Sequence, residues 1–169
     1  MLHRSCDRAL ITKNEVWENG DAGVALYESS DCKVVKNILT ENRQGIRWSN
    51  GANRNIVKKN DIKHSSLDGY AVYMYSGSDE PEADGNVDGS ILDNKFHRNT
   101  VKSDNPDAVE IQDAHDNSFK FNNITKGEFA TFEDSIGNIW NKNTVPVGFS
   151  FDVDSDSCFS NNDEGLLRC

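Results

Sequence analysis

Tyrosine, arginine and histidine residues recur on the same predicted outward face of successive short segments, where they could form a row on the surface. They are His3, Tyr27, Arg47, Tyr73 and Tyr75. A tyrosine ring offers an apolar face to a sugar ring and a hydroxyl to its oxygens. An arginine offers a forked pair of donors to a carboxylate. The row therefore favours an acidic polysaccharide as partner. We expect no nucleic acid, because the basic residues are too few for a phosphate track.

The row depends on short strands that repeat along the chain. Each strand alternates apolar with variable residues, the period of two that is typical of a strand with one buried face. In the first, Val24 and Leu26 are predicted to face inward and Ala25 and Tyr27 outward. Glu28 follows at the turn and is predicted to help bind the substrate. The segments are "GVALY" at 23–27, "GIRWS" at 45–49, "AVYMY" at 71–75, "AVEIQ" at 108–112, "FATFE" at 129–133 and "GFSFD" at 148–152.

Asparagines mark a second repeat, each with an apolar residue three positions before it and another two positions after it. They are Asn14, Asn37, Asn60, Asn94, Asn122 and Asn143. Successive members are 23, 23, 34, 28 and 21 residues apart, and a period near 23 is typical of solenoids. The sequence therefore predicts an all-β, right-handed parallel β-helix of about six coils. The asparagines would stack at an inner corner as a structural ladder in which each amide is satisfied by the next coil.

The domain organisation follows from the repeat. Residues 1–153 are predicted to form the β-helix, and residues 154–169 a polar C-terminal tail. The two long spacings indicate an acidic insertion at 76–90 and a shorter one at 101–107. Loops inserted into a solenoid often line its binding face.

No cofactor is firmly predicted, and calcium is the ion that the acidic segments would hold. The candidates in the insertion are Asp79, Glu80, Glu82, Asp84 and Asp88. In the tail, Asp152, Asp154 and Asp156 alternate as at the start of a calcium loop, but Ser157 stands where such a loop has glycine.

The four cysteines are too few for a disulfide scaffold and lack the spacing of zinc ligands. Cys158 and Cys169 bracket the tail, and we predict a disulfide between them, which would place the protein in an oxidising compartment. Cys6 and Cys32 could pair or remain free thiols. The single glycosylation sequon begins at Asn123, which is predicted to face outward.

The charge is unevenly distributed along the chain. The net charge is −10, from 18 basic and 28 acidic side chains. Residues 1–65 hold 11 basic and 8 acidic side chains, whereas residues 66–169 hold 7 and 20. A basic early end would attract an anionic polymer that the rest of the chain repels. The sequence contains neither a signal peptide nor an apolar run of about 18 residues, so we expect no membrane association.

The sequence resembles the mannuronan C-5-epimerases of brown algae and of the bacterial periplasm. The resemblance is carried by "GVALYESSD" with "RQGIR" one coil later, and by "VYMYSGSDEPEADG", which is similar to the algal branch. It covers most of the chain and implies a β-helix that acts on alginate outside the cell or in the cell wall. The implied reaction removes the proton at carbon 5 of mannuronate and returns one to the opposite face, which gives guluronate.

The catalytic stretch of that family, Asp-Pro-His-Asp or similar, is absent from this sequence, and "DNPD" at 104–107 lacks its histidine. His3 and Arg4 are the weak catalytic candidates that remain, and His64, His97 and His115 are predicted to be solvated near the coil corners. We expect the chain to supply a distal substrate groove, as a monomer or with upstream coils of a longer chain, and to be inactive or weakly active alone. A polysaccharide lyase of the same fold and a non-catalytic alginate-binding or cell-wall β-helix stay open as alternatives.

Overall fold

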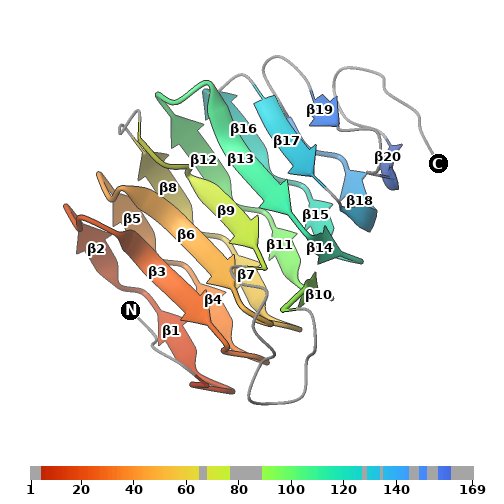
Figure 1. The fold of residues 1–169 in the computed structure, drawn as a ribbon. Helices are drawn as coiled ribbons and strands as arrows, with labels where there is room; N and C mark the ends of the chain where they lie inside the picture. The colour runs from red at the N-terminus through yellow and green to blue at the C-terminus, as the bar shows by residue number, and fades with distance from the viewer. Residues whose placement is uncertain are drawn as a thin grey trace.

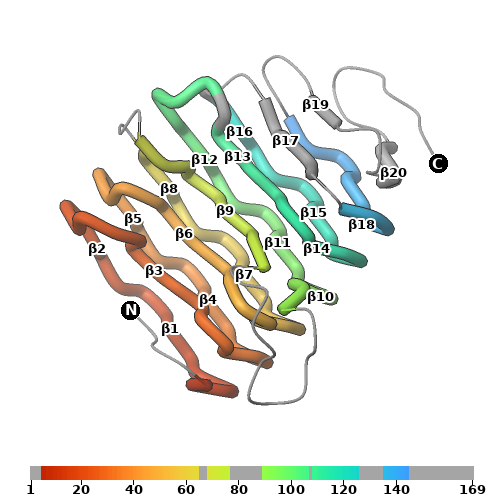
Figure 2. The backbone as a smooth tube through the Cα atoms, viewed as in Figure 1, coloured from red at the N-terminus to blue at the C-terminus, as the bar shows by residue number. Residues whose placement is uncertain are grey.

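Short parallel strands wind into a solenoid in which each coil lies on the one before it. The computed structural model describes residues 5–64, 68–76, 89–126, 129–133, 135–144, 149–151 and 156–160, and these contain strands but no helix. In Figure 1 one sheet faces the viewer and two lie behind it, and Figure 2 shows the coils following one another from the N-terminal to the C-terminal end.

Three sheets hold nearly all the strands, and every strand pair is parallel. Sheet A contains β3 (Ala22–Tyr27), β6 (Gln44–Ser49), β9 (Val72–Tyr75), β13 (Asp107–Gln112), β17 (Phe129–Glu133) and β19 (Phe149–Phe151). Sheet B contains β1 (Leu10–Thr12), β4 (Lys33–Val35), β7 (Ile56–Lys58), β11 (Lys95–His97), β15 (Ser118–Lys120), β18 (Ile136–Asn141) and β20 (Asp156–Ser160). Sheet C contains β2 (Glu15–Trp17), β5 (Ile38–Thr40), β8 (Asp61–His64), β12 (Thr100–Ser103) and β16 (Asn123–Lys126). A small fourth sheet pairs β10 (Ile91–Leu92) with β14 (Ala114–His115). Sheet C has five strands, so about five turns are complete, where the sequence predicted about six.

The core lies inside the solenoid and consists of side chains stacked from coil to coil. Val34, Val57, Phe96, Phe119 and Trp140 occupy one inward position on sheet B, and each is at most 1% exposed. The rings of Phe119 and Trp140 lie nearly parallel, with their centroids 4.3 Å apart. Burial of an apolar side chain of this size stabilises a fold by roughly 1.5–3 kcal/mol. The period-two alternation therefore places one apolar stack behind each sheet.

An asparagine ladder fixes the corner between sheets B and C. Its members, joined by side-chain hydrogen bonds, are Asn14, Asn37, Asn60, Asn99, Asn122 and Asn143. At Asn60, Oδ1 accepts bonds from the N–H and the Nδ2 of Asn37 (2.8 and 3.0 Å). Its Nδ2 donates to the carbonyl of Val34 and to Oδ1 of Asn99, both at 3.0 Å. Each buried amide is thus satisfied by the coils on either side.

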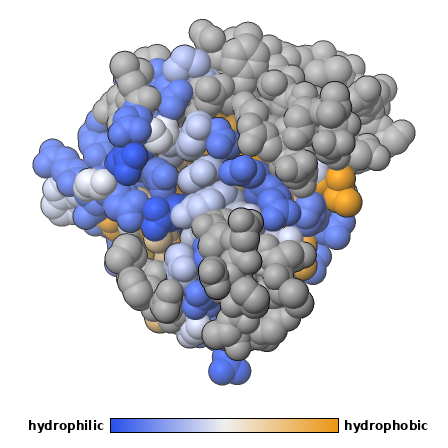
Figure 3. Space-filling view, viewed as in Figure 1, coloured by the Kyte–Doolittle hydropathy of each residue, from blue (hydrophilic) through white to orange (hydrophobic). Residues whose placement is uncertain are grey.

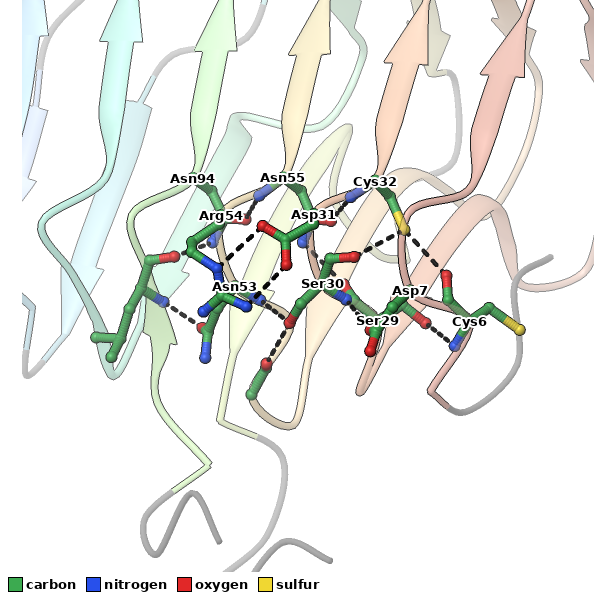
Figure 4. A network of polar contacts seen from close by, with 12 residues as sticks. Cys6, Asp7, Ser29, Ser30, Asp31, Cys32, Asn53, Arg54, Asn55 and Asn94 are labelled. Carbon is green, nitrogen blue, oxygen red and sulfur yellow. Dashed lines mark hydrogen bonds and ion pairs between the residues drawn. The ribbon is translucent and has the colours of Figure 1, made fainter. Parts of the chain in front are cut away.

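The assignment of Asn94 to this ladder was wrong. Asn94 belongs to a second ladder, at the corner between sheets A and B, whose members are Asn55, Asn94, Asn117 and Asn138. Figure 4 shows Asn55 between Cys32 and Asn94, with the Cys32 N–H donating to Asn55 Oδ1 at 2.8 Å. The spacing rule failed here because Asn94 and Asn99 both fit it and share one apolar neighbour. Phe96 lies two residues after Asn94 and three residues before Asn99.

The predicted insertion at 101–107 was a consequence of that error. Asn99 and Asn122 are 23 residues apart, and β12 is paired in register with β8, so residues 100–103 belong to an ordinary coil. The single long interval is the one of 39 residues from Asn60 to Asn99, and it contains the acidic insertion at 76–90. The boundary at 153 was also too early, because β20 pairs with β18 and continues sheet B to Ser160.

Candidate functional site

The outer face of sheet A brings together most of the residues predicted to bind a substrate. Arg47 of β6 is in register with Tyr73 of β9, so the two lie on neighbouring coils about 4.8 Å apart. Tyr75 points to the same side two residues further along β9, and Ser49 separates it from Tyr27 in the neighbouring row. The predicted line therefore exists as two short rows, one containing Arg47 and Tyr73 and the other Tyr27 and Tyr75.

The rings of Tyr70, Tyr73 and Tyr75 lie side by side in a row at β9 and just before it, and we call this row the tyrosine file. The rings of Tyr73 and Tyr75 are stacked, with centroids 4.7 Å apart and an interplanar angle of 10°. Tyr70 adds a third ring, 5.0 Å from that of Tyr73. Tyr70 was not predicted, because it precedes both the alternating segment and β9. The file offers the half-exposed apolar surface on which a sugar ring can pack.

The guanidinium of Arg47 is already engaged by a carboxylate. Asp21, from the turn before β3, accepts two bonds from it at 2.9 and 3.2 Å, and Gln44 Oε1 accepts a third at 3.4 Å. The Arg47 side chain is 18% exposed and that of Asp21 is 47% exposed. A rotation of the Asp21 side chain into solvent would therefore leave the guanidinium in place. A uronate carboxylate could therefore take the place of the Asp21 carboxylate on a guanidinium that is already held in position.

Tyr27 and Glu28 stand where sheet A ends and the chain turns toward sheet B. Asn50 Nδ2 donates to the Tyr27 hydroxyl at 3.0 Å, which ties the phenol to the neighbouring coil. Glu28 has φ +47°, and its N–H donates to the carbonyl of Ser49 at 3.1 Å. Both residues are half-buried, and their contacts give them a part in the turn as well as a place beside the tyrosine file.

Two of the histidines that were expected to be solvated have both ring nitrogens bonded. His64 is 2% exposed, which corrects the prediction for it. Its Nε2 must carry the proton, because it lies 2.7 Å from the carbonyl of Arg43, and its Nδ1 then accepts from Ser103 Oγ at 3.0 Å. His115 Nδ1 accepts from the Ile136 N–H at 3.2 Å, and its Nε2 donates to Asp113 at 3.1 Å. These rings are structural, and neither offers an unpaired nitrogen to a substrate.

The two cysteines left open by the sequence, Cys6 and Cys32, do not form a disulfide with each other. Cys32 is buried, and its Sγ–H is directed at the carbonyl of Cys6, 3.1 Å away. Burial, the largest cause, raises the pKa of the Cys32 thiol. In the same network, shown in Figure 4, Arg54 binds both carboxylate oxygens of Asp31 at 2.9 and 3.0 Å and holds the pKa of that carboxyl below its ordinary value.

Several predicted residues lie outside the part of the chain that the structure describes. They are His3, Arg4, the carboxylates of residues 79–88, Asp152, Asp154 and Cys169. The predicted Cys158–Cys169 disulfide and the calcium candidates therefore stay predictions. Among the described residues there is no group of three or more His, Cys, Asp or Glu side chains that could hold a metal ion. The same residues contain no helix long and apolar enough to cross a membrane.

The viewed face of the solenoid is mainly hydrophilic where its residues are described, as Figure 3 shows. The parallel sheets, the polar outer face and the apolar side chains stacked inside together make this protein a parallel β-solenoid. The family described as "Right handed beta helix region" matches residues 3–88, just over half of the chain. The chain belongs to this family, and the predicted right-handed parallel β-helix is confirmed. Comparisons with curated proteins and with solved structures gave no match.

Proposed function

We propose that the chain binds an acidic polysaccharide of the alginate class on the outer face of sheet A, as the distal substrate groove of a mannuronan C-5-epimerase. The observation that carries the proposal is the register of Arg47 with the tyrosine file of β9. The rings provide a surface for pyranose packing, and the guanidinium provides a forked donor for a uronate carboxylate. The β-helix fold is compatible with proteins that act on polysaccharides, and the resemblance to the epimerases supplies the substrate and the extracellular or cell-wall location.

Titration calorimetry with mannuronate oligomers tests the groove. Arg47→Ala should weaken binding roughly fivefold, because it removes the donor for the carboxylate. Asp21→Asn should strengthen binding roughly twofold, because it frees the guanidinium and removes a competing negative charge. Arg54→Ala is the matched control, since Arg54 also binds an aspartate through two nitrogens but lies away from the tyrosine file. Unchanged affinity in both the Arg47 and the Asp21 variants would show that the polymer does not use this face.

A non-catalytic polysaccharide-binding β-helix is the second candidate function. It is favoured by the bonding of both ring nitrogens in His64 and His115, which are structural in these coils. Proton NMR of polymannuronate incubated with the chain separates the candidates. Guluronate signals would indicate epimerisation and unsaturated ends would indicate a lyase. Neither signal, together with measurable binding, would indicate a module that binds without reaction.

A further inference from the structure

A line of positive charge follows the corner between sheets B and C. In every coil the residue directly before the ladder asparagine is exposed and has φ between +54° and +58°. These residues are Lys13, Lys36, Lys59, Arg98, Phe121 and Lys142. Since five of the six are lysine or arginine, each coil but one presents a cation at the same point of its circumference.

Backbone hydrogen bonds keep these positions in line. The N–H of Lys36 donates to the carbonyl of Lys58 in the next coil, and that of Lys59 donates to the carbonyl of His97, both at 3.2 Å. The N–H of Arg98 donates in the same way to Lys120 at 2.9 Å. The cations are therefore spaced by one coil, about 4.8 Å, along the axis of the solenoid.

Outward side chains of sheet B widen this line into a surface. His97 is in register with Lys58 on one side and Lys120 on the other. We call the whole set the basic strip: Lys13, Lys33, Lys36, Lys58, Lys59, Lys95, His97, Arg98, Lys120 and Lys142. Within the described part of the chain, none of these side chains forms an ion pair, whereas Arg43, Arg47, Arg54 and Lys63 do. The pKa of His97 is lowered, first by burial and then by Lys120 and its cationic neighbours, as expected in a field of unpaired positive charge.

The line carries one aromatic side chain, that of Phe121, which is exposed and lies between two cations. The guanidinium carbon of Arg98 lies 5.4 Å from the centroid of the Phe121 ring, and Lys142 Nζ lies 5.5 Å from it. The two cations come from the coils before and after Phe121, so the ring holds them by cation–π contacts. A single-stranded nucleic acid needs successive aromatic platforms for its bases, and this strip does not provide them.

We propose that the basic strip is a second binding surface, separate from sheet A, for one acidic polysaccharide chain laid along the axis of the solenoid. Each uronate ring carries one carboxylate, and a pyranose ring is about as long as the rise of one coil, so carboxylates and cations can meet ring by ring. Among the described residues no side chain of the strip forms an ion pair, although the net charge of the protein is −10. The strip is therefore the surface that attracts an anionic polymer over the longest range. This inference does not depend on the function proposed for sheet A.

Calorimetry and NMR with a mannuronate hexamer test the strip in the full chain. The double variant Lys36→Gln/Lys59→Gln removes two charges from the line and should bind roughly fivefold to tenfold more weakly at low salt. Lys63→Gln/Lys102→Gln is the matched control, because it also removes two exposed lysines, which lie side by side on the neighbouring strands β8 and β12 of sheet C. Control affinity close to that of the wild type, with melting temperatures unchanged in both double variants, would support the proposal. Equal affinities for the strip variant and the control would overturn it.

The pKa of His97 gives a readout that a structural role of the lysines would not move. Saturation with the hexamer should raise the His97 pKa, because carboxylates would neutralise the cations beside it. The rise should persist in Arg47→Ala, which separates this proposal from the one for sheet A, and should shrink in Lys36→Gln/Lys59→Gln. If the His97 pKa does not change on saturation with the hexamer, the hexamer does not bind at the basic strip. Tighter binding of an oligothymidylate of equal charge would make the ligand a nucleic acid and would overturn the choice of polysaccharide.

Discussion

The side chain of Asn60 uses all its hydrogen-bonding capacity inside the solenoid. It is 2% exposed and bonds to Asn37, Val34 and Asn99. Asn60→Leu keeps the volume but leaves several buried backbone and amide groups unpaired, and should lower the free energy of unfolding by about 1–3 kcal/mol. Asn14→Leu should cost less, since Asn14 is exposed at the first coil. Urea denaturation measures both, and an equal cost at the two positions would contradict the ladder account.

The ladder asparagines show how far the sequence alone predicts the role of a single residue. The apolar neighbours of an asparagine identified Asn14, Asn37, Asn60, Asn122 and Asn143, which the hydrogen bonds join in one ladder. The same neighbours could not choose between two asparagines of one coil. Only the hydrogen bond from Asn60 to Asn99 makes that choice, because it depends on which corner each residue occupies.

The strands were predictable as elements because their apolar residues alternate, and in β9 the burial from Val72 to Tyr75 alternates in the same way. In β3 the neighbouring coils also bury the outward residue Ala25. Their outward residues were harder to interpret. Arg47 and Tyr73 were correctly expected on one face, but the Asp21 carboxylate that occupies the guanidinium comes from a turn 26 residues earlier. The basic strip left a signal that was overlooked, a lysine or arginine directly before five of the six ladder asparagines. Four of these cations precede asparagines that the sequence had assigned correctly, and the place of Asn99 in the ladder adds Arg98 to them.

The position of His97 in β11, between lysines of two neighbouring strands, should make the stability of the protein depend on pH. His97 lies between Lys58 of β7 and Lys120 of β15, and its pKa is below the ordinary 6.5, first because of burial. The unfolded chain therefore binds the proton more readily than the folded protein. Stability should be full above about pH 6.5 and should fall as the pH drops below it.

Urea denaturation across pH 5–8 measures this effect as a difference between variants. His97→Gln should flatten the loss of stability on the acid side, and Lys95→Gln should reduce it by removing one of the neighbouring cations. Identical slopes in the wild type and His97→Gln would mean that His97 is protonated equally in the folded and unfolded states.

In the whole molecule, charge is divided by face as well as along the axis. Residues 1–65 carry a net positive charge and residues 66–169 a net negative charge, which suggested an anionic ligand at the first coils. The fold shows that the charge is also divided around the solenoid. Lys95, Arg98, Lys120 and Lys142 all come from the acidic segment 66–169 but lie on the strip that begins with Lys13 and Lys36. A solenoid can thus keep one cationic line along its full length while its net charge stays at −10.

The length of that line predicts how affinity depends on the size of the ligand. The six positions of the line, from Lys13 to Lys142, are separated by five steps of about 4.8 Å, so the strip spans roughly 24 Å. Affinity for mannuronate oligomers should rise with each added ring until the oligomer covers this span, and should then level off. The rise should be largest at low salt, because exposed charges are screened beyond about 8 Å at physiological ionic strength. Calorimetry with a series of oligomers from dimer to decamer measures the dependence. A plateau already at the dimer or trimer would restrict binding to a single coil, and the continuous surface along the axis would then have to be abandoned.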